Sequence, residues 1–227
     1  MASESLNLDP KETALIVVDM QNDFCHPQGF YARNSDRMMS IGLDPDLVSA
    51  RIGSMKTLLE AARRAGLFIV HTQIIRDPDS FNKVELLHRI VPRTHRSYMD
   101  APGDPPLVPN SWGADTHDEL APLPGEYVLA KRAYSSFYQT DLEMVLRRRG
   151  IRTVIVTGTV TYACVLHTAF DANVRDFDVI MASDGVGSWA PDLQEPTLQI
   201  VDLILGAVAP TSELVEMLAV AGAPDAK

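Results

Sequence analysis

Short apolar runs rich in β-branched residues recur along the chain and alternate with longer helical patterns. Five runs read as strands, because near-continuous apolar stretches are typical of a parallel sheet buried on both faces. They are Thr13 to Asp19, Leu67 to Thr72, Tyr127 to Lys131, Thr153 to Thr157 and Phe177 to Ala182. Amphipathic helices are expected from about Asp46 to Ala65, Thr140 to Arg149, Cys164 to Arg175 and Pro191 to Leu205.

Repeated β-α units predict one open parallel sheet whose right-handed crossovers place helices on both faces. The expected fold class is therefore α/β, with a doubly wound sheet in three α/β/α layers. At 227 residues the chain can bury one sizeable core, and no convincing linker or internal repeat divides it. We therefore expect residues 1–227 to form a single domain.

One proline-rich stretch of weak periodicity, residues 74–125, interrupts the alternation. It is longer than an ordinary connection in a compact domain, and such loops are usually functional or disordered. Because it joins the second expected strand to the third, it should emerge near the carboxyl edge of the sheet, where open α/β folds bind ligands. We interpret it as a lid or a subunit contact, with a partly disordered excursion as the alternative.

The charge balance narrows the range of partners. The chain carries 30 acidic against 20 basic residues, a formal charge of −10, and such a surface repels phosphate backbones and anionic lipid. Neither nucleic acid nor a membrane is an expected partner. No secretory signal is visible at the N-terminus, and the two cysteines, Cys25 and Cys164, exclude a disulfide framework. We expect a cytoplasmic protein.

Three residues with side chains that can take part in catalysis lie at or after the ends of separate expected strands. Asp19 ends the first expected strand, Lys131 ends the third, and Cys164 follows the fourth and opens a helix. In a parallel sheet all three project at one edge, and a charged residue that closes a buried strand is costly unless it is exposed, paired or functional. The alternative for Cys164 is a small buried hydrophobe, which is how most free cysteines behave.

A shared site of these residues would suit acyl transfer. The first turn of a helix favours a thiolate, and its free N–H groups can bind the oxyanion of a tetrahedral intermediate. Asp19 can accept the thiol proton and later deliver it to a departing amine, while the positive charge of Lys131 stabilises the thiolate. Neither a metal nor another cofactor is required.

Three segments carry a resemblance to a known family: ALIVVDMQNDF at 14–24, VLAKRAYSSF at 128–137 and TGTVTYACVLHTAFDA at 157–172. The chain resembles the isochorismatase-like cysteine hydrolases from about Thr13 to Glu213. This resemblance implies a Rossmann-like parallel sheet, a catalytic triad of Asp19, Lys131 and Cys164, and a cis peptide between Thr159 and Val160. It also implies an oxyanion hole formed by the backbone N–H groups of Val160 and Cys164.

The stretch from Ser111 to Thr159 is most similar to ureidoacrylate amidohydrolases and to biuret and triuret hydrolases. The implied activity is hydrolysis of a C–N amide bond in a small linear ureido or carbamoyl compound, with release of ammonia or carbamate. Family members that are nicotinamidases bind a metal through a D-x-H element, whereas the matching region here reads HTQIIRD from His71 to Asp77. That difference argues against nicotinamidase activity and against a metal. A homo-oligomer, dimer or tetramer, is also expected.

Other residues near the expected strand ends allow more than one interpretation. Candidate substrate contacts are Phe24, Gln73, Tyr134 and Phe137, although both phenylalanines could equally be core residues. A Cys-His dyad with His167 is a weaker alternative, since an i,i+3 pair need not point its ring at the thiol. The Asp23, Cys25 and His26 group lacks a second cluster with metal-ligand spacing and reads as loop, and His71 reads as a core histidine.

Three competing functions remain open at this level. The first is an amidase for another small amide, of the N-carbamoyl amino acid or maleamate type. The second is a non-catalytic binding paralogue that has kept the fold. The third is a redox-sensing thiol protein in which Cys25 would resolve an oxidised Cys164, for which one exposed thiol of low pKa would suffice.

Overall fold

The computed structural model describes residues 8–76, 92–98, 101 and 103–221. Within them six strands form one parallel sheet in the order β3-β2-β1-β4-β5-β6. The strands are β1 (Thr13–Val18), β2 (Phe68–Ile74), β3 (Tyr127–Lys131), β4 (Thr153–Thr159), β5 (Asp178–Gly187) and β6 (Ala207–Ala209). The expected single α/β domain with a doubly wound parallel sheet is confirmed.

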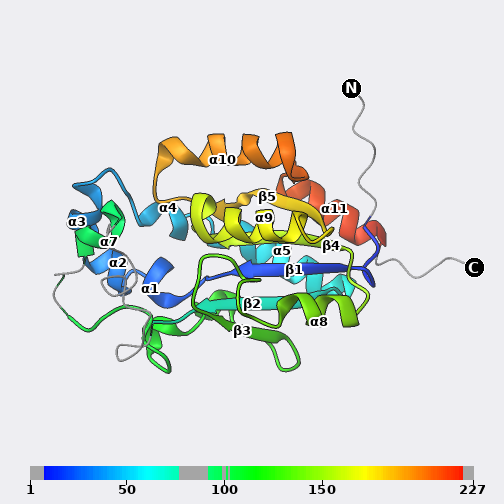
Figure 1. Cartoon of the computed structure of the whole chain (residues 1–227), viewed down its shortest axis with the longest axis horizontal. Coiled ribbons are helices and arrows are strands. Elements are labelled where there is room, and N and C mark those ends of the chain that lie inside the picture. Colours follow the sequence, from blue (N-terminus) through cyan, green and yellow to red (C-terminus); the bar gives the residue numbers. More distant parts are fainter. Residues whose placement is uncertain (1–7, 77–91, 99–100, 102, 222–227) are drawn as a thin grey trace, which may run out of the picture.

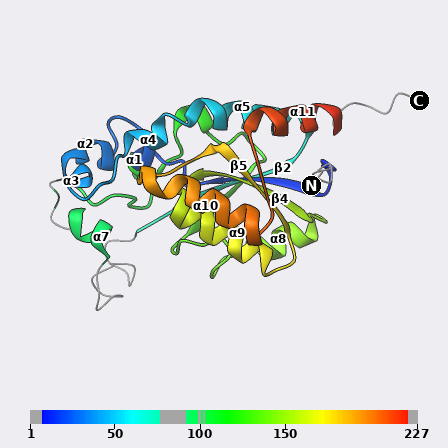
Figure 2. The ribbon, with the colours of Figure 1, turned by 90° about the horizontal axis from the view of Figure 1, so that it is seen from above.

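Helices cover both faces of this sheet (Figure 2). Helices α5 (Ile52–Ala65) and α11 (Thr211–Ala221) lie on one face, and α8 (Leu142–Arg148), α9 (Leu166–Asn173) and α10 (Pro191–Ile204) lie on the other. Shorter helices gather at one end of the sheet: α1 (Asn22–Cys25), α2 (Phe30–Arg33), α3 (Ser35–Met39), α4 (Asp46–Ser49) and α7 (Arg93–Tyr98). No helix of the described residues is long and apolar enough to cross a membrane.

All five expected strands are present, four of them with shifted ends, and the differences in the helices have local causes. The helix expected from Asp46 to Ala65 is two helices, α4 and α5, separated at residues 50–51. The helix expected from Cys164 begins instead as a π-helical turn, Thr161–Val165. Strand β6 and helices α1 to α3 were not expected, because elements of three to five residues are too short to show a period.

The sheet separates two apolar clusters, as near-continuous apolar strands require. Alternate residues of β1 point to opposite faces: Leu15 and Val17 pack with α5 and α11, whereas Ala14, Ile16 and Val18 pack with α8, α9 and α10. Every residue of β1 is buried. A polar side chain just past this strand can therefore reach water only at the end of the sheet.

The order in which strands are added to the sheet reverses at β1. It runs from β1 outward through β2 to β3, then returns to β4 on the other side of β1 and continues to β5 and β6. The carboxyl ends of β1 and β4 therefore lie side by side at the topological switch point, where folds of this class bind ligands. In Figure 1 this is the end near α1 and α2.

Candidate active site

Asp19 leaves β1 in a left-handed conformation, with φ 49°, and its side chain is fully buried. Its amide donates to the Thr72 carbonyl oxygen (3.1 Å) and to Thr72 Oγ1 (3.2 Å), and Thr72 Oγ1 donates to Asp19 Oδ1 (2.7 Å). An aspartate tolerates this backbone region better than most residues, and these hydrogen bonds to Thr72 of the neighbouring strand hold it there. Thr72 thus fixes the Oδ1 oxygen of the carboxylate and leaves Oδ2 for other partners.

Lys131 reaches Asp19 from the last position of β3, across β2. Because β2 lies between them, β3 and β1 are about 9.6 Å apart, so only a long side chain spans the gap. Its Nζ lies 2.8 Å from Asp19 Oδ2 and donates to the carbonyl oxygens of Ala133 (3.0 Å) and Tyr134 (2.8 Å). Burial lowers the pKa of Lys131, but Asp19 and Cys164 outweigh it and hold that pKa above its ordinary value. The lysine is therefore a fixed positive charge.

Asp19 Oδ2 is buried and is paired with the Lys131 ammonium at 2.8 Å, whereas Oδ1 accepts from Thr72. Both the lysine and the Cys164 thiol interact with this carboxylate. Oδ2 is the position at which Asp19 can accept a proton.

Cys164 is brought to the same place by the turn that follows β4. The Thr159–Val160 peptide bond is cis, and the π-helical turn Thr161–Val165 carries the cysteine before α9 begins. Gly158 lets β4 approach β1 here, because its φ is 114° and a Cβ would overlap the Val18 carbonyl oxygen. Val160 is buried in the same turn, and its carbonyl accepts from the amides of Ala163 and Val165.

The thiol of Cys164 differs from the expected thiolate. Burial raises its pKa to about 12; Lys131 opposes this and Asp19 adds to it. The side chain is only 4% exposed, and the loss of water around it disfavours the charged thiolate. The structure thus brings Asp19, Lys131 and Cys164 together, with a neutral thiol beside a carboxylate and an ammonium group.

A polar run directly after Asp19 holds the segment that covers this edge. Gln21 Nε2 donates to the carbonyls of Ile74 (3.0 Å) and Ala114 (2.8 Å), and its Oε1 accepts from the Ile74 amide (2.9 Å). Asn22 donates to the Trp112 carbonyl (2.8 Å), and Asp23 accepts from the Leu107 amide (2.8 Å). The described part of the 74–125 connection is docked at the carboxyl edge, as expected.

Sequence reasoning missed Gln21, Asn22 and Asp23 as positioning residues, and it also missed Thr72. A signal was available, because three consecutive polar residues follow a fully apolar strand. Buried polar groups must find hydrogen-bond partners, and here the partners come from a segment about ninety residues away. Which segment supplies them depends on the tertiary fold.

Three of the expected substrate contacts lie near the carboxyl edge. Phe24 is buried and stacks on Tyr31, with ring centroids 5.2 Å apart, and Trp189 closes the cluster at 4.6 Å from Tyr31. Gln73 Nε2 donates to Thr116 Oγ1 (3.1 Å). Tyr134 is 41% exposed beside Lys131. Their roles toward a substrate stay predictions.

Phe137 is placed differently. It is buried in the core with its ring centroid 5.9 Å from Phe177, which directly precedes β5 at the amino edge of the sheet. Phe137 therefore packs as a core residue, in the same apolar cluster as Cys164, and a role toward a substrate stays a prediction. His167 gives no support to a dyad, since its Nδ1 contacts the Ala163 carbonyl (2.8 Å) and its ring lies 5.3 Å from the Tyr134 ring.

In the group Asp23, Cys25 and His26, which was considered above as a metal site, the side chains of Asp23 and Cys25 form hydrogen bonds to nearby backbone groups. Cys25 Sγ donates to the Gln21 carbonyl (3.1 Å), and Asp23 Oδ1 accepts from the Phe30 amide (3.0 Å). Burial raises the pKa of Cys25 to about 12, so it too is a neutral thiol. In the described part of the chain, no group of three or more His, Cys, Asp or Glu is arranged to hold a metal ion. Asp77 lies outside the described residues.

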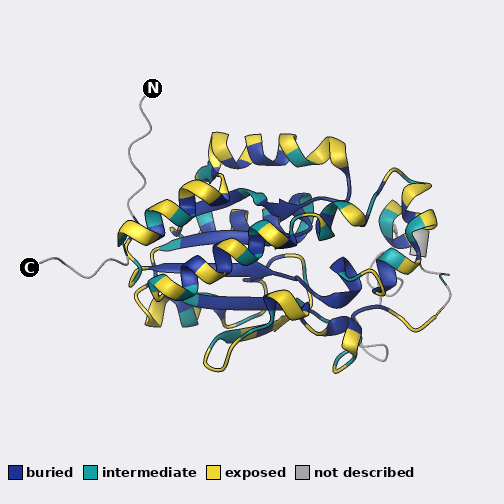
Figure 3. Cartoon of the chain, turned by 180° about the vertical axis from the view of Figure 1, so that it is seen from behind, coloured by how far each residue is buried: buried dark blue, intermediate teal, exposed yellow. Residues whose placement is uncertain are grey.

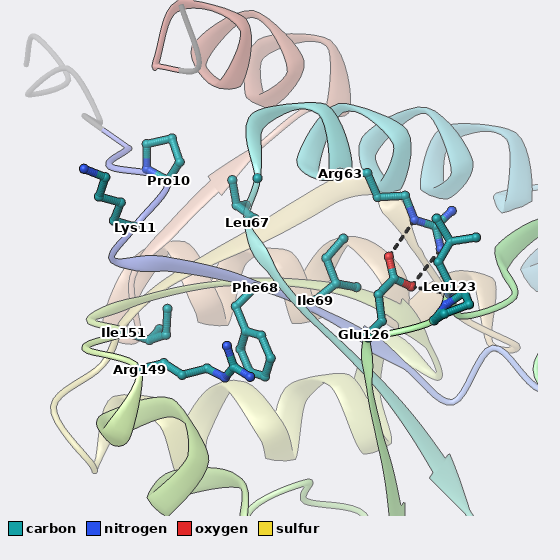
Figure 4. A pocket seen from close by; sticks show the side chains of 13 residues that line it. Pro10, Lys11, Arg63, Leu67, Phe68, Ile69, Leu123, Glu126, Arg149 and Ile151 are labelled. Carbon is teal, nitrogen blue, oxygen red and sulfur yellow. Dashed lines mark hydrogen bonds and ion pairs between the residues drawn. The ribbon is translucent and has the colours of Figure 1, made fainter. Parts of the chain in front are cut away.

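A cavity of about 490 Å³ lies at the amino end of the strands, and its lining includes neither Asp19 nor Cys164. Figure 4 shows the side chains that line it. Phe68 and Arg149 line it, and the Arg149 guanidinium lies 4.0 Å from the centre of the Phe68 ring. At its other side Arg63 donates to both oxygens of Glu126 (2.8 and 2.9 Å), which also contacts buried His71 (2.9 Å). Burial lowers the pKa of His71, in agreement with a neutral core histidine.

Comparisons with known proteins identify the fold and the family. A family model described as the isochorismatase domain matches residues 13–213. A cysteine hydrolase from Pseudomonas syringae pv. phaseolicola 1448A superposes with a TM-score of 0.77 at 27% identity, covering 97% of this chain and 100% of that chain. N-carbamoylsarcosine amidase from Thermoplasma acidophilum gives 0.66 at 30% identity, over 88% and 96% of the two chains.

Nicotinamidase from Bacillus subtilis is a further similar structure, with a TM-score of 0.66 at 25% identity over 87% of this chain and 99% of that chain. The matches span nearly the whole length of each solved protein, so the likeness covers the complete fold and not one motif. The chain belongs to the isochorismatase family and is a member of the isochorismatase-like cysteine hydrolase superfamily.

Proposed function

We propose that this chain is a cysteine-dependent amidohydrolase that cleaves a C–N bond of a small linear ureido or carbamoyl compound. The observation that carries the proposal is the convergence of Asp19, Lys131 and Cys164 from three strand ends in a buried site. A thiol, a buried carboxylate that can accept its proton and a fixed ammonium are the parts that acyl transfer needs.

In the first half of the reaction Cys164 Sγ attacks the amide carbonyl carbon. Because the thiol is neutral, its proton passes to Asp19 Oδ2 as the S–C bond forms, and Lys131 stabilises the negative charge that moves between them. The carbonyl oxygen becomes an oxyanion, for which the amides of Val160 and Cys164 are the proposed donors. When the C–N bond breaks, the proton returns from Asp19 to the departing nitrogen.

The second half hydrolyses the thioester. Water attacks the acyl carbon, gives one proton to Asp19 and forms a second tetrahedral intermediate. The C–S bond then breaks, and the leaving sulfur takes the proton back from Asp19, which restores the neutral thiol. With a ureide, loss of ammonia in the first half leaves a carbamoyl thioester, and its hydrolysis releases a carbamate.

The proposed substrate class is supported by one similar structure and by the candidate contacts Gln73 and Tyr134 near the carboxyl edge of the sheet. The N-carbamoylsarcosine amidase of Thermoplasma acidophilum is 30% identical to this chain, and by its name it acts on a carbamoyl compound. A ureido group needs paired donors and acceptors, which Gln73 and nearby backbone groups can supply, while the ring of Tyr134 can cover its planar face. An amidase for N-carbamoyl amino acids or maleamate is the alternative within the same mechanism.

The test is ammonia release from a substrate panel: biuret, triuret, ureidoacrylate, N-carbamoyl amino acids, maleamate and nicotinamide. Cys164→Ser and Cys164→Ala should abolish turnover of whichever compound is hydrolysed. Cys25→Ala is the matched control, because it removes the other buried free thiol and should retain turnover. Full activity of Cys164→Ala would refute the mechanism, and a folded protein inert toward every member would favour a non-catalytic binding paralogue.

A further inference from the structure

Gln194, near the start of α10, is hydrogen-bonded to two separate segments beside the candidate active site. Thr161 Oγ1 donates to Gln194 Oε1 (2.8 Å), and Gln194 Nε2 donates to the carbonyl oxygens of Val186 (3.2 Å) and Ser183 (3.4 Å). Figure 3 shows that α10 is exposed on its outer side and buried where it faces the sheet. Gln194 is half-buried, and both polar atoms of its side chain are bonded inside the fold.

The two carbonyl groups that Gln194 contacts belong to an irregular part of β5. Along β4 the pairing advances only from Val156 to Gly158, while on β5 it advances from Met181 to Val186. The extra residues of β5 therefore leave the regular ladder, and their backbone groups need other partners. The Gln194 amide supplies two N–H donors at this bulge. Bulges of this kind are frequent next to active sites, where they redirect the chain.

The bulge also fixes the orientation of the Gln194 amide. Both of its N–H groups are directed at carbonyl oxygens, which can only accept, so the amide oxygen has to face Thr161. A flipped amide would place its oxygen against two other oxygens. The Thr161 hydroxyl must then donate to Oε1, and this residue is fully buried. The position of the Thr161 side chain is thus determined by Gln194.

Thr161 lies at the start of the turn that carries the nucleophile. It directly follows Val160, whose amide is a proposed oxyanion donor, and it opens the π-helical turn that contains Cys164. On the other side of Val160, Thr159 Oγ1 donates to the Gly187 carbonyl (3.2 Å). The residues before and after Val160 are therefore both tied to the second half of β5, one directly and the other through Gln194.

We propose that Gln194 is a positioning residue for the hydrolysis: it holds Thr161 so that the Val160 amide is aimed at the oxyanion of the tetrahedral intermediates. Gln194 acts through Thr161, without contact to the substrate, and the inference rests on the proposed amidohydrolase function. An oxyanion donor stabilises charge that develops only in the transition state, so misalignment lowers kcat more than it raises KM. The thiol depends on Asp19 and Lys131 and should keep its reactivity.

Steady-state ammonia release from the best substrate of the panel tests this role. Gln194→Met removes the amide and keeps the length of the side chain, and kcat should fall about 10- to 100-fold with KM changed less than about threefold. Thr161→Val should have the same effect, and the double variant should lose little more than either single one, because both remove one contact. Thr161→Ser keeps the hydroxyl and should retain most of the activity.

Gln199→Met is the matched control on the same helix. Gln199 is exposed, and its side chain donates to Glu195 of α10 (3.4 Å). This variant loses a glutamine amide that has no contact to the nucleophile turn, so its kcat should stay within about twofold of the wild type. Thermal unfolding of all variants verifies that each is folded at the temperature of the assay.

Alkylation of Cys164 by iodoacetamide separates positioning of the oxyanion donor from disruption of the whole site. The reagent is attacked at a saturated carbon and forms no oxyanion, so the rate in Gln194→Met should match the wild type within about twofold at each pH. The measurement is made with Cys25→Ala in both chains, so that one thiol reports.

The outcomes separate this role from the proposed function. Undiminished kcat in Gln194→Met or Thr161→Val would overturn the role of Gln194 and leave the amidohydrolase proposal standing. An alkylation rate that falls in parallel with kcat would do the same, because it would show a displaced thiol. A wild-type chain that is inert toward every amide of the panel would overturn the amidohydrolase proposal and this role with it.

Discussion

Thr72→Val removes the hydroxyl that orients Asp19 and keeps the volume of the side chain. Thr72 Oγ1 donates to Asp19 Oδ1 at 2.7 Å and accepts from the Asp19 amide at 3.2 Å, and both residues are buried. Without this donor the carboxylate can rotate about its Cβ–Cγ bond, and Oδ2 no longer stays directed at the thiol and Lys131. The effect should appear in the chemical step, because Thr72 is expected to act through Asp19.

The magnitude follows from the type of bond that is lost. A hydrogen bond to a charged group contributes about 1.5 to 3 kcal/mol, and about 1.4 kcal/mol corresponds to a tenfold change in rate. We therefore expect kcat to fall about 10- to 150-fold, with KM changed less than about threefold. Thr72→Ser should restore most of the lost activity, because it returns the hydroxyl.

The assay is steady-state ammonia release on the best substrate of the panel, together with urea unfolding of each variant. Thr157→Val is the control: Thr157 is a fully buried threonine on β4 whose hydroxyl donates to the Gly185 carbonyl. It should lose stability like Thr72→Val and keep kcat within about twofold. If the two variants lost equal amounts of kcat, or if Thr72→Val were as fast as the wild type, the positioning role of Thr72 would be refuted.

Three further outcomes are expected. Glu126→Gln should lower the free energy of unfolding by about 2 kcal/mol near neutral pH. Burial opposes ionisation of Glu126, but hydrogen bonds from its arginine and backbone partners lower its pKa from 4.5 to about 2. This contribution is present above pH 4.5 and is lost as pH falls toward 2, which acid unfolding measures. The exposed Glu119 serves as control, and Glu119→Gln should cost under about 0.5 kcal/mol. Iodoacetamide should modify Cys164 at a rate that keeps rising above pH 9, because its pKa is raised to about 12; a plateau below pH 9 would contradict the neutral thiol. Gly158→Ala should reduce stability by at least about 2 kcal/mol in thermal unfolding, since the added Cβ meets the Val18 carbonyl at a positive φ.

The amino-acid pattern was sufficient for five of the six strands, because strands buried on both faces appear in the sequence as apolar runs. Tyr127 to Lys131 was predicted with the bounds that the structure has. The helix expected from Asp46 was continuous in the pattern and is broken in the structure, where α4 packs separately against β5. Strand β6 has three residues and exists because the edge of β5 offers hydrogen-bond partners, and sequence periodicity cannot record that.

For the candidate site, the sequence determined which residues end the strands, and parallel topology then required Asp19, Lys131 and Cys164 to share one edge. Only the tertiary structure decided how they are related. The order of the strands puts β1 beside β4 and Lys131 two strands from Asp19, and close packing leaves almost no water around the thiol. A helix turn that favours a thiolate is a local property that sequence can indicate. Desolvation depends on every segment packed around the residue, and here burial is the largest effect on the pKa of Cys164 and raises it.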